Sequence, residues 1–133
     1  MALDLSLIQD ERVNYTVRQG NAFVIEIDYP EANLTTPSDI TGYTFFSELR
    51  DNTADDSTTP IHTFSLTPDT NGNYYEVDYP NAKTKFHFSD NLSRTLKPKK
   101  QYFFESKTLD AGIVIDSVVV YIEAVSEYAR GTI

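Results

Sequence analysis

The chain has 133 residues, no cysteine, a net charge of −9 and an isoelectric point near 4.5. This length fits one domain with one core. The lack of cysteine excludes disulfides, thiolate metal sites and cysteine nucleophiles. The acidic balance disfavours nucleic acid and anionic membranes as partners. Nine tyrosines and eight phenylalanines, with no tryptophan, favour strands over helices and exclude a disordered chain.

The first segment, residues 1–10, alternates weakly, with leucines at positions 3, 5 and 7. We interpret it as an edge strand or as an arm that docks on a neighbouring chain. It has neither a basic start nor a long apolar stretch, so it does not look like a secretion signal, and we expect a protein made in a cytoplasm. A short strand with Val13, Tyr15 and Val17 on one face follows and ends at Gln19-Gly20.

Two alternating strands come next, separated by a polar loop. In residues 22–29 the apolar face holds Phe23, Ile25, Ile27 and Tyr29. In residues 43–50 one face holds Tyr43, Phe45, Ser47 and Leu49. Alternation with a period of two is typical of a strand buried on one side only.

The middle of the chain contains an exposed loop and three shorter strands. Residues 51–60 have no apolar periodicity and predict the loop. Residues 68–73 contain Asn-Gly and predict a tight turn. The predicted strands are residues 61–67, 74–79 and 83–89.

The last third predicts one short helix and a long hairpin. Residues 89–96 are the single helical candidate, with Ser89 as its cap. Residues 101–109 and 113–125 form the hairpin around Asp110-Ala111-Gly112. Its second strand is apolar on both faces and is therefore expected to be central or covered. Residues 126–133 are a tail.

About eight short strands separated by turns predict a single all-β domain, either a sandwich or a barrel. The side chains expected in its core are Phe23, Ile25, Phe45, Leu49, Phe86, Phe104, Val120 and Ile122.

No residue pattern in the chain is typical of an enzyme or of a metal site, and we assign no catalytic, cofactor-binding or metal-binding residue. His62 and His87 lie on strand faces and are expected to be ordinary surface histidines. Two acidic clusters have the oxygen ligands that cations prefer, but neither has the spacing of a calcium loop. They are Asp51 with Asp55 and Asp56, and Asp69 with Asn71 and Asn73. Residues 97–100, KPKK, form a basic turn that suits solvent or an anionic contact.

Several short motifs, taken in order, resemble those of one family. They begin with Gln19-Gly20 ahead of a strand and Asp39-Ile40-Thr41-Gly42 ahead of the next, which ends in Glu48-Leu49-Arg50. They continue with Phe86–Ser89, Tyr102–Glu105, the glycine hairpin and Val118–Tyr121. The chain resembles the N-terminal immunoglobulin-like domain of bacteriophage upper baseplate proteins and related small tail or fibre-attachment proteins. It departs from the pattern in its longer, more acidic 51–60 loop and in ending at Ile133 without a receptor-binding extension.

The resemblance implies an antiparallel immunoglobulin-like β-sandwich with no catalytic residues. It further implies a virion structural protein, an adaptor at the baseplate or a fibre attachment point. Its partners would be other tail, baseplate or fibre proteins and copies of itself in a symmetric particle. Two alternatives remain open: a carbohydrate-binding module that uses tyrosine and phenylalanine platforms, and a small glycosidase-like enzyme, for which the chain is short.

Residues 1–10 give a testable prediction, because an alternating arm cannot bury its own leucines and suits main-chain pairing on a neighbour. Deleting them should leave a folded domain and reduce its incorporation into particles. Incorporation of the shortened chain at the full level would show that the arm makes no necessary contact between chains.

Overall fold

The computed structural model describes residues 13–29, 39–51 and 60–126. Within them lie one short helix and eight strands. In chain order they are β1 (Val13–Arg18), β2 (Phe23–Asp28), β3 (Thr44–Asp51), β4 (His62–Phe64), β5 (Tyr74–Asp78), β6 (Lys83–Phe88), α2 (Asp90–Thr95), β7 (Gln101–Asp110) and β8 (Ile113–Val125).

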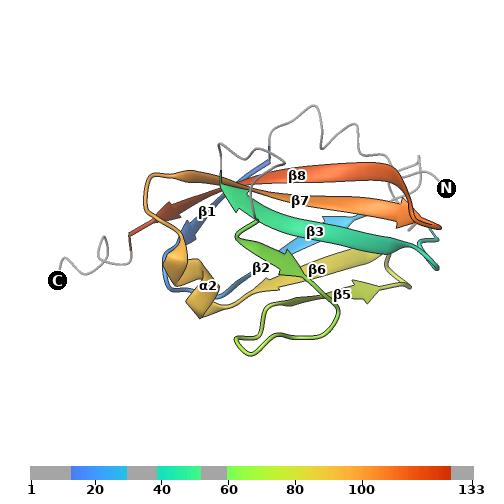
Figure 1. The fold of residues 1–133 in the computed structure, drawn as a ribbon, viewed down its shortest axis with the longest axis horizontal. Coiled ribbons are helices and arrows are strands. Elements are labelled where there is room, and N and C mark those ends of the chain that lie inside the picture. Colours follow the sequence, from blue (N-terminus) through green and yellow to red (C-terminus); the bar gives the residue numbers. More distant parts are fainter. Residues whose placement is uncertain (1–12, 30–38, 52–59, 127–133) are drawn as a thin grey trace.

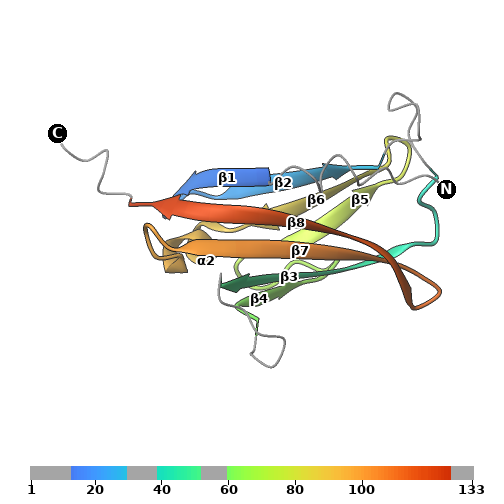
Figure 2. The same ribbon diagram turned by 90° about the horizontal axis from the view of Figure 1, so that it is seen from above.

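The strands form two sheets packed face to face. One sheet has five strands in the order β1-β8-β7-β3-β4, and the other has three in the order β2-β6-β5. Figure 1 looks at the sandwich from the edge that carries β4 and β5, and Figure 2 shows the five-stranded sheet face on. The all-β sandwich predicted from the sequence is therefore confirmed. All pairs are antiparallel except β1 with β8, which run parallel at one edge.

A cluster of aromatic rings fills the space between the sheets. Phe104 of β7 lies 4.7 Å from Phe86 and 5.6 Å from Phe88, both in β6 on the opposite sheet, measured between ring centroids. Phe64 of β4 lies 5.5 Å from Phe104 and 4.7 Å from Phe88. All four side chains are at least 96% buried. Offset and edge-on contacts of this kind add to the hydrophobic stabilisation of the burial itself.

The predicted strand faces are confirmed, and so is the helix. Seven of the eight expected core side chains are buried. The eighth, Phe23, is only partly buried, because it begins edge strand β2 and stacks on Phe88 at the rim of the core. Ser89 caps α2, since its Oγ accepts a hydrogen bond from the Leu92 N–H at 3.0 Å. Strand β8 lies between β1 and β7, as its two apolar faces predicted.

A tyrosine secures the connection between α2 and β7. The Tyr102 hydroxyl accepts a hydrogen bond of 2.7 Å from the backbone N–H of Lys97. Immunoglobulin-like sandwiches carry a tyrosine of this kind near the start of the equivalent strand, two residues before a disulfide cysteine in antibody domains. Here the residue two positions on is Phe104, a member of the aromatic cluster.

The structure shortens one predicted strand. Residues 61–67 were expected to be extended throughout, but β4 covers only His62–Phe64. Beyond it the chain turns away, and the Ser65 hydroxyl donates to the Thr67 carbonyl at 2.8 Å. Such local side-chain bonding competes with strand pairing. The predicted arm (1–10), the 52–59 part of the loop and tail residues 127–133 lie outside the described residues.

Replacing Phe104 with alanine should lower the free energy of unfolding by about 3–5 kcal/mol, because its ring is buried and touches three others. Phe103 is the matched control: it lies on the outer face of the same strand and is partly exposed. Its replacement should cost about 1 kcal/mol. Denaturant unfolding measures both, and equal losses would contradict the assigned strand faces.

Candidate functional site

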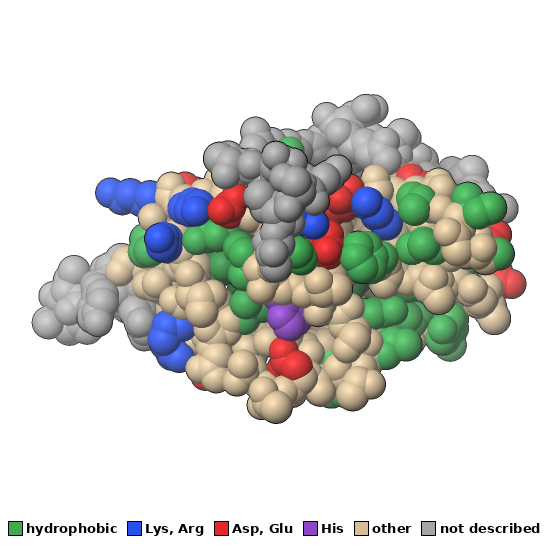
Figure 3. Space-filling model, in the orientation of Figure 1, with side chains coloured by type: hydrophobic (Ala, Val, Ile, Leu, Met, Phe, Trp, Pro, Cys, Tyr) green, Lys and Arg blue, Asp and Glu red, His purple; other side chains and the backbone are tan. Residues whose placement is uncertain are grey.

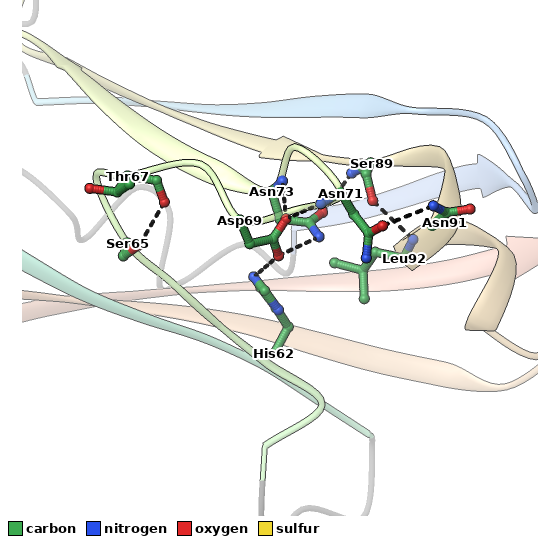
Figure 4. Close-up of polar contacts among 9 residues, drawn as sticks. All are labelled: His62, Ser65, Thr67, Asp69, Asn71, Asn73, Ser89, Asn91 and Leu92. Carbon is green, nitrogen blue, oxygen red and sulfur yellow. Dashed lines mark hydrogen bonds and ion pairs between the residues drawn. The ribbon is translucent and has the colours of Figure 1, made fainter.

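The acidic cluster at Asp69, to which the sequence assigned no metal, is a hydrogen-bonded turn (Figure 4). Asp69 Oδ1 accepts from the backbone N–H groups of Asn71 and Asn73 at 2.8 and 3.0 Å, and Oδ2 accepts from Asn73 Nδ2 at 2.9 Å. Desolvation acts to raise the pKa of Asp69, but these hydrogen bonds outweigh it and hold the pKa below its usual value. The carboxylate oxygens are thus already engaged by the chain itself.

Asn73 links this turn to helix α2. Its side chain is 3% exposed, and Oδ1 accepts a hydrogen bond of 2.7 Å from the buried backbone N–H of Ser89. Next to it, Asn91 Nδ2 donates to Asn71 Oδ1 at 3.0 Å on the surface. The role of the cluster is therefore structural: it fixes the residue that caps α2.

His62 packs against an aromatic ring and faces the same turn. Its ring meets Phe64 edge-on, with centroids 4.6 Å apart, and Nε2 lies 3.7 Å from Asp69 Oδ2. Burial lowers the pKa of His62, and the Asp69 carboxylate opposes the shift only in part. Figure 4 shows the His62 ring pointing toward the Asp69 carboxylate.

His87 lies elsewhere, on the outer face of the three-stranded sheet. Its ring stacks on Tyr74 with centroids 4.3 Å apart and planes 6° from parallel. Its Nε2 lies 2.6 Å from Glu76 Oε2. Two shallow hollows of about 340 and 370 Å³ adjoin this pair, and His87 lines both. The two histidines therefore lie apart, and each is close to one carboxylate.

The remaining candidates are the basic turn and the acidic cluster that includes Asp51. Lys100 of the basic turn lies 3.4 Å from Asp51 and 5.6 Å from the centre of the Tyr102 ring. Asp55 and Asp56 lie outside the described residues. Among residues 13–29, 39–51 and 60–126, no three histidine, aspartate or glutamate side chains gather as metal ligands. The same residues contain no helix long and apolar enough to cross a membrane.

The motif at Gln19-Gly20 has a structural role that the sequence alone did not disclose. Gln19 Nε2 donates to the backbone carbonyls of Arg94 and Leu96 at 3.2 and 3.0 Å, at the end of α2. The Gly20 N–H donates to Ser93 Oγ at 3.1 Å, and Gly20 takes a φ of +89°. The turn after β1 is therefore tied to a helix more than seventy residues further along the chain.

The step ahead of β3 is also built by its motif. Asp39 Oδ1 accepts from the Thr41 N–H at 3.0 Å, and Gly42 takes a φ of +86°, a conformation that glycine adopts without strain. Between them Ile40 is 1% exposed. The motif therefore turns the chain and also buries the Ile40 side chain in the core.

The hairpin between β7 and β8 exposes three successive aliphatic side chains. Ile113, Val114 and Ile115 are 68%, 51% and 41% exposed. Ala111 and Gly112 have φ values of +52° and +83°. The pairing of β7 with β8 shifts in register between Thr108 and Leu109 of β7. Figure 3 shows hydrophobic side chains gathered at the end of the molecule where β7 turns into β8. An exposed apolar group on an ordered turn marks a candidate contact surface.

Two pairs of hydroxyl groups are buried in the core. The hydroxyls of Tyr29 and Thr84 are 3.1 Å apart, and Ser47 Oγ donates to Ser106 Oγ at 2.9 Å. Burial raises the pKa of Tyr29 to about 12, so this hydroxyl stays neutral and serves only as a hydrogen-bonding group.

Comparison with known proteins supports the fold alone. The sequence matches no family model and no curated protein. A solved structure of the NK cell receptor Nkp44 is similar, with a TM-score of 0.50 and 13% sequence identity, over 86% of this chain and 98% of that one. The sandwich is accordingly immunoglobulin-like, as the motifs implied.

Replacing Asn73 with alanine should lower the free energy of unfolding by about 1–3 kcal/mol, because the buried Ser89 N–H loses its acceptor. Asn71→Ala removes an exposed hydrogen bond from the same turn and should change stability by less than about 0.5 kcal/mol. Thermal or denaturant unfolding compares the two. Equal effects would show that Asn73 does not fix the helix cap.

Stability should depend on pH through His62. Its pKa is lowered in the folded chain, whereas the unfolded chain takes up this proton as the pH falls through about 6.5. The unfolded state therefore binds more protons, and the contribution of His62 is intact above that pH and lost on the way down to the folded pKa. Between pH 7.5 and 5, the melting temperature should fall further for the unaltered chain than for His62→Gln. Parallel curves would contradict the shift.

Proposed function

We propose that this protein is a non-enzymatic structural component of a bacteriophage tail, an adaptor at the baseplate or at a fibre attachment point. It would bind neighbouring tail proteins and further copies of itself within a symmetric particle. The observation that carries the proposal is that the motifs resembling those of tail proteins build the frame of the domain. Gln19 and Gly20 form a turn that is bonded to the distant helix α2, and Gly42 lies in the turn ahead of β3. None of the three lines either of the two hollows beside His87.

The described surface suits contact more than chemistry. Both histidines lie beside a carboxylate, and Lys83 pairs with Asp28. The hairpin tip, defined as residues 113–115, offers exposed aliphatic area instead. Protein interfaces place such apolar side chains at their centre and polar groups at their rim. Asp110 and Asp116 flank the tip and supply that rim.

Carbohydrate binding is the second candidate function. Most aromatic rings lie in the core, which disfavours a broad aromatic platform. One observation supports the candidate: Tyr74 and His87 stack on the outside of the three-stranded sheet. A glycan array separates a sugar-binding module from a purely structural adaptor.

The adaptor proposal predicts that the protein is present in purified virus particles. Mass spectrometry of particles from the phage that carries the gene, together with antibody labelling in electron micrographs, should place it at the tail. A gene with no tail sheath, hub or fibre gene beside it, and particles without the protein, would refute the proposal.

A substitution at the hairpin tip tests the contact surface. Ile113→Ser should leave the melting temperature nearly unchanged, because this side chain is 68% exposed, and should reduce incorporation into particles. Leu66→Ser is the matched control, since Leu66 is 62% exposed and belongs to the segment after β4, outside the tip. Equal incorporation of both variants would show that the tip makes no contact in the tail.

A further inference from the structure

The outer face of the three-stranded sheet carries two neighbouring rows of side chains, one of valine and ring side chains and one of charged side chains. Strand register aligns Val24, His87 and Tyr74 in the first row and Glu26, Lys85 and Glu76 in the second. These side chains point away from the core, because the residues that alternate with them, such as Ile25 and Phe86, are buried. An apolar plate and a set of hydrogen-bonding groups therefore lie side by side on one surface.

The plate is held in place before any ligand arrives. The Tyr74 and His87 rings are parallel at 4.3 Å, and Glu76 fixes the imidazole through its 2.6 Å contact with Nε2. Stacking occupies one face of the Tyr74 ring. Tyr74 and His87 both line the hollow of about 340 Å³.

The charged row forms a second, polar hollow. The hollow of about 370 Å³ is lined by Tyr15, Val24, Glu26, Glu76, Lys85 and His87. Lys85 Nζ lies 3.7 Å from Glu26 Oε1, and Glu76 is paired with His87. Each carboxylate already faces a basic group, so the hollow has little charge of its own to offer to an ion. Its remaining lone pairs and N–H groups suit uncharged hydroxyl partners.

The two hollows adjoin each other. The hollow of about 340 Å³ extends past the rings to Asn71, Ser89 and Asp90, and it shares Val24 and His87 with the polar hollow. Both volumes lie in the range of small-molecule sites, about 300–1,000 Å³. An elongated ligand of two or more units fits this arrangement better than a compact one.

We propose that this face binds a neutral oligosaccharide. A sugar ring has an apolar C–H face and a rim of hydroxyls, which match the Tyr74–His87 plate and the Glu26–Lys85–Glu76 row. A wholly apolar ligand would cover the charged row without hydrogen bonds, at a cost in desolvation. Anionic glycans and nucleic acids are repelled by the chain's net charge of −9. The site does not depend on the tail assignment, since it concerns a different surface from the hairpin tip.

The test is a glycan array followed by titration of the full chain in solution. The array carries neutral oligosaccharides of glucose, galactose, mannose, rhamnose and N-acetylglucosamine, with sialylated and sulfated glycans and an arginine-rich peptide as charged probes. The best neutral glycan is then titrated into the isotope-labelled chain by NMR. We expect chemical-shift changes on β5 and β6 and about a tenfold loss of affinity in Tyr74→Leu, which corresponds to about 1.4 kcal/mol of binding free energy.

Two further variants keep the result interpretable. Phe46→Leu removes a ring that is 45% exposed from the other sheet and should bind like the unaltered chain. Glu26→Gln keeps the shape and an acceptor oxygen but removes the charge, and should weaken binding less than Tyr74→Leu. Failure of every neutral glycan to bind, selective binding of a charged probe, or full affinity in a folded Tyr74→Leu would each overturn the proposal.

Discussion

The sandwich depends on the contact of Phe104 with Phe64, Phe86 and Phe88. These rings join the two sheets, since Phe64 and Phe104 come from the five-stranded sheet and Phe86 and Phe88 from the other. Antibody domains also join their two sheets by a disulfide. This chain has no cysteine, so the same constraint must come from packing. Aromatic packing, unlike a disulfide, does not depend on an oxidising environment.

A second level of order comes from hydrogen bonds between turns that are distant in sequence. Gln19 and Ser93 tie the end of β1 to α2, Asn73 ties the 68–73 turn to the start of α2, and Tyr102 ties the end of α2 to β7. Hydrogen bonds from three other parts of the chain thus hold the short helix and its two ends. A six-residue helix has little stability of its own, so these contacts must hold it.

The two surfaces that we single out differ in chemistry, and so would their partners. The hairpin tip is aliphatic and projects from one end of the sandwich, which suits burial against another protein. The outer face of β2, β6 and β5 carries charged side chains in ion pairs and one stacked pair of rings. Such a face suits a ligand with hydroxyl groups. A domain can carry both, because one lies at an end and the other on a face of the same rigid frame.

The sequence by itself determined which residues form strands, which face each strand buries, where α2 is capped and where the hairpin turns. Those features follow from local rules: a period of two in apolar residues, Ser89 ahead of a helical turn, and Gly112 where φ must be positive. Only the tertiary structure decided the sheet order, the parallel pairing of β1 with β8, the early end of β4 and the role of Gln19. It also decided that Asp69 and Asn73 build a turn, while Tyr74 and His87 stack on the outside. These outcomes rest on contacts between residues far apart in the chain, and such contacts leave no periodic trace in the sequence.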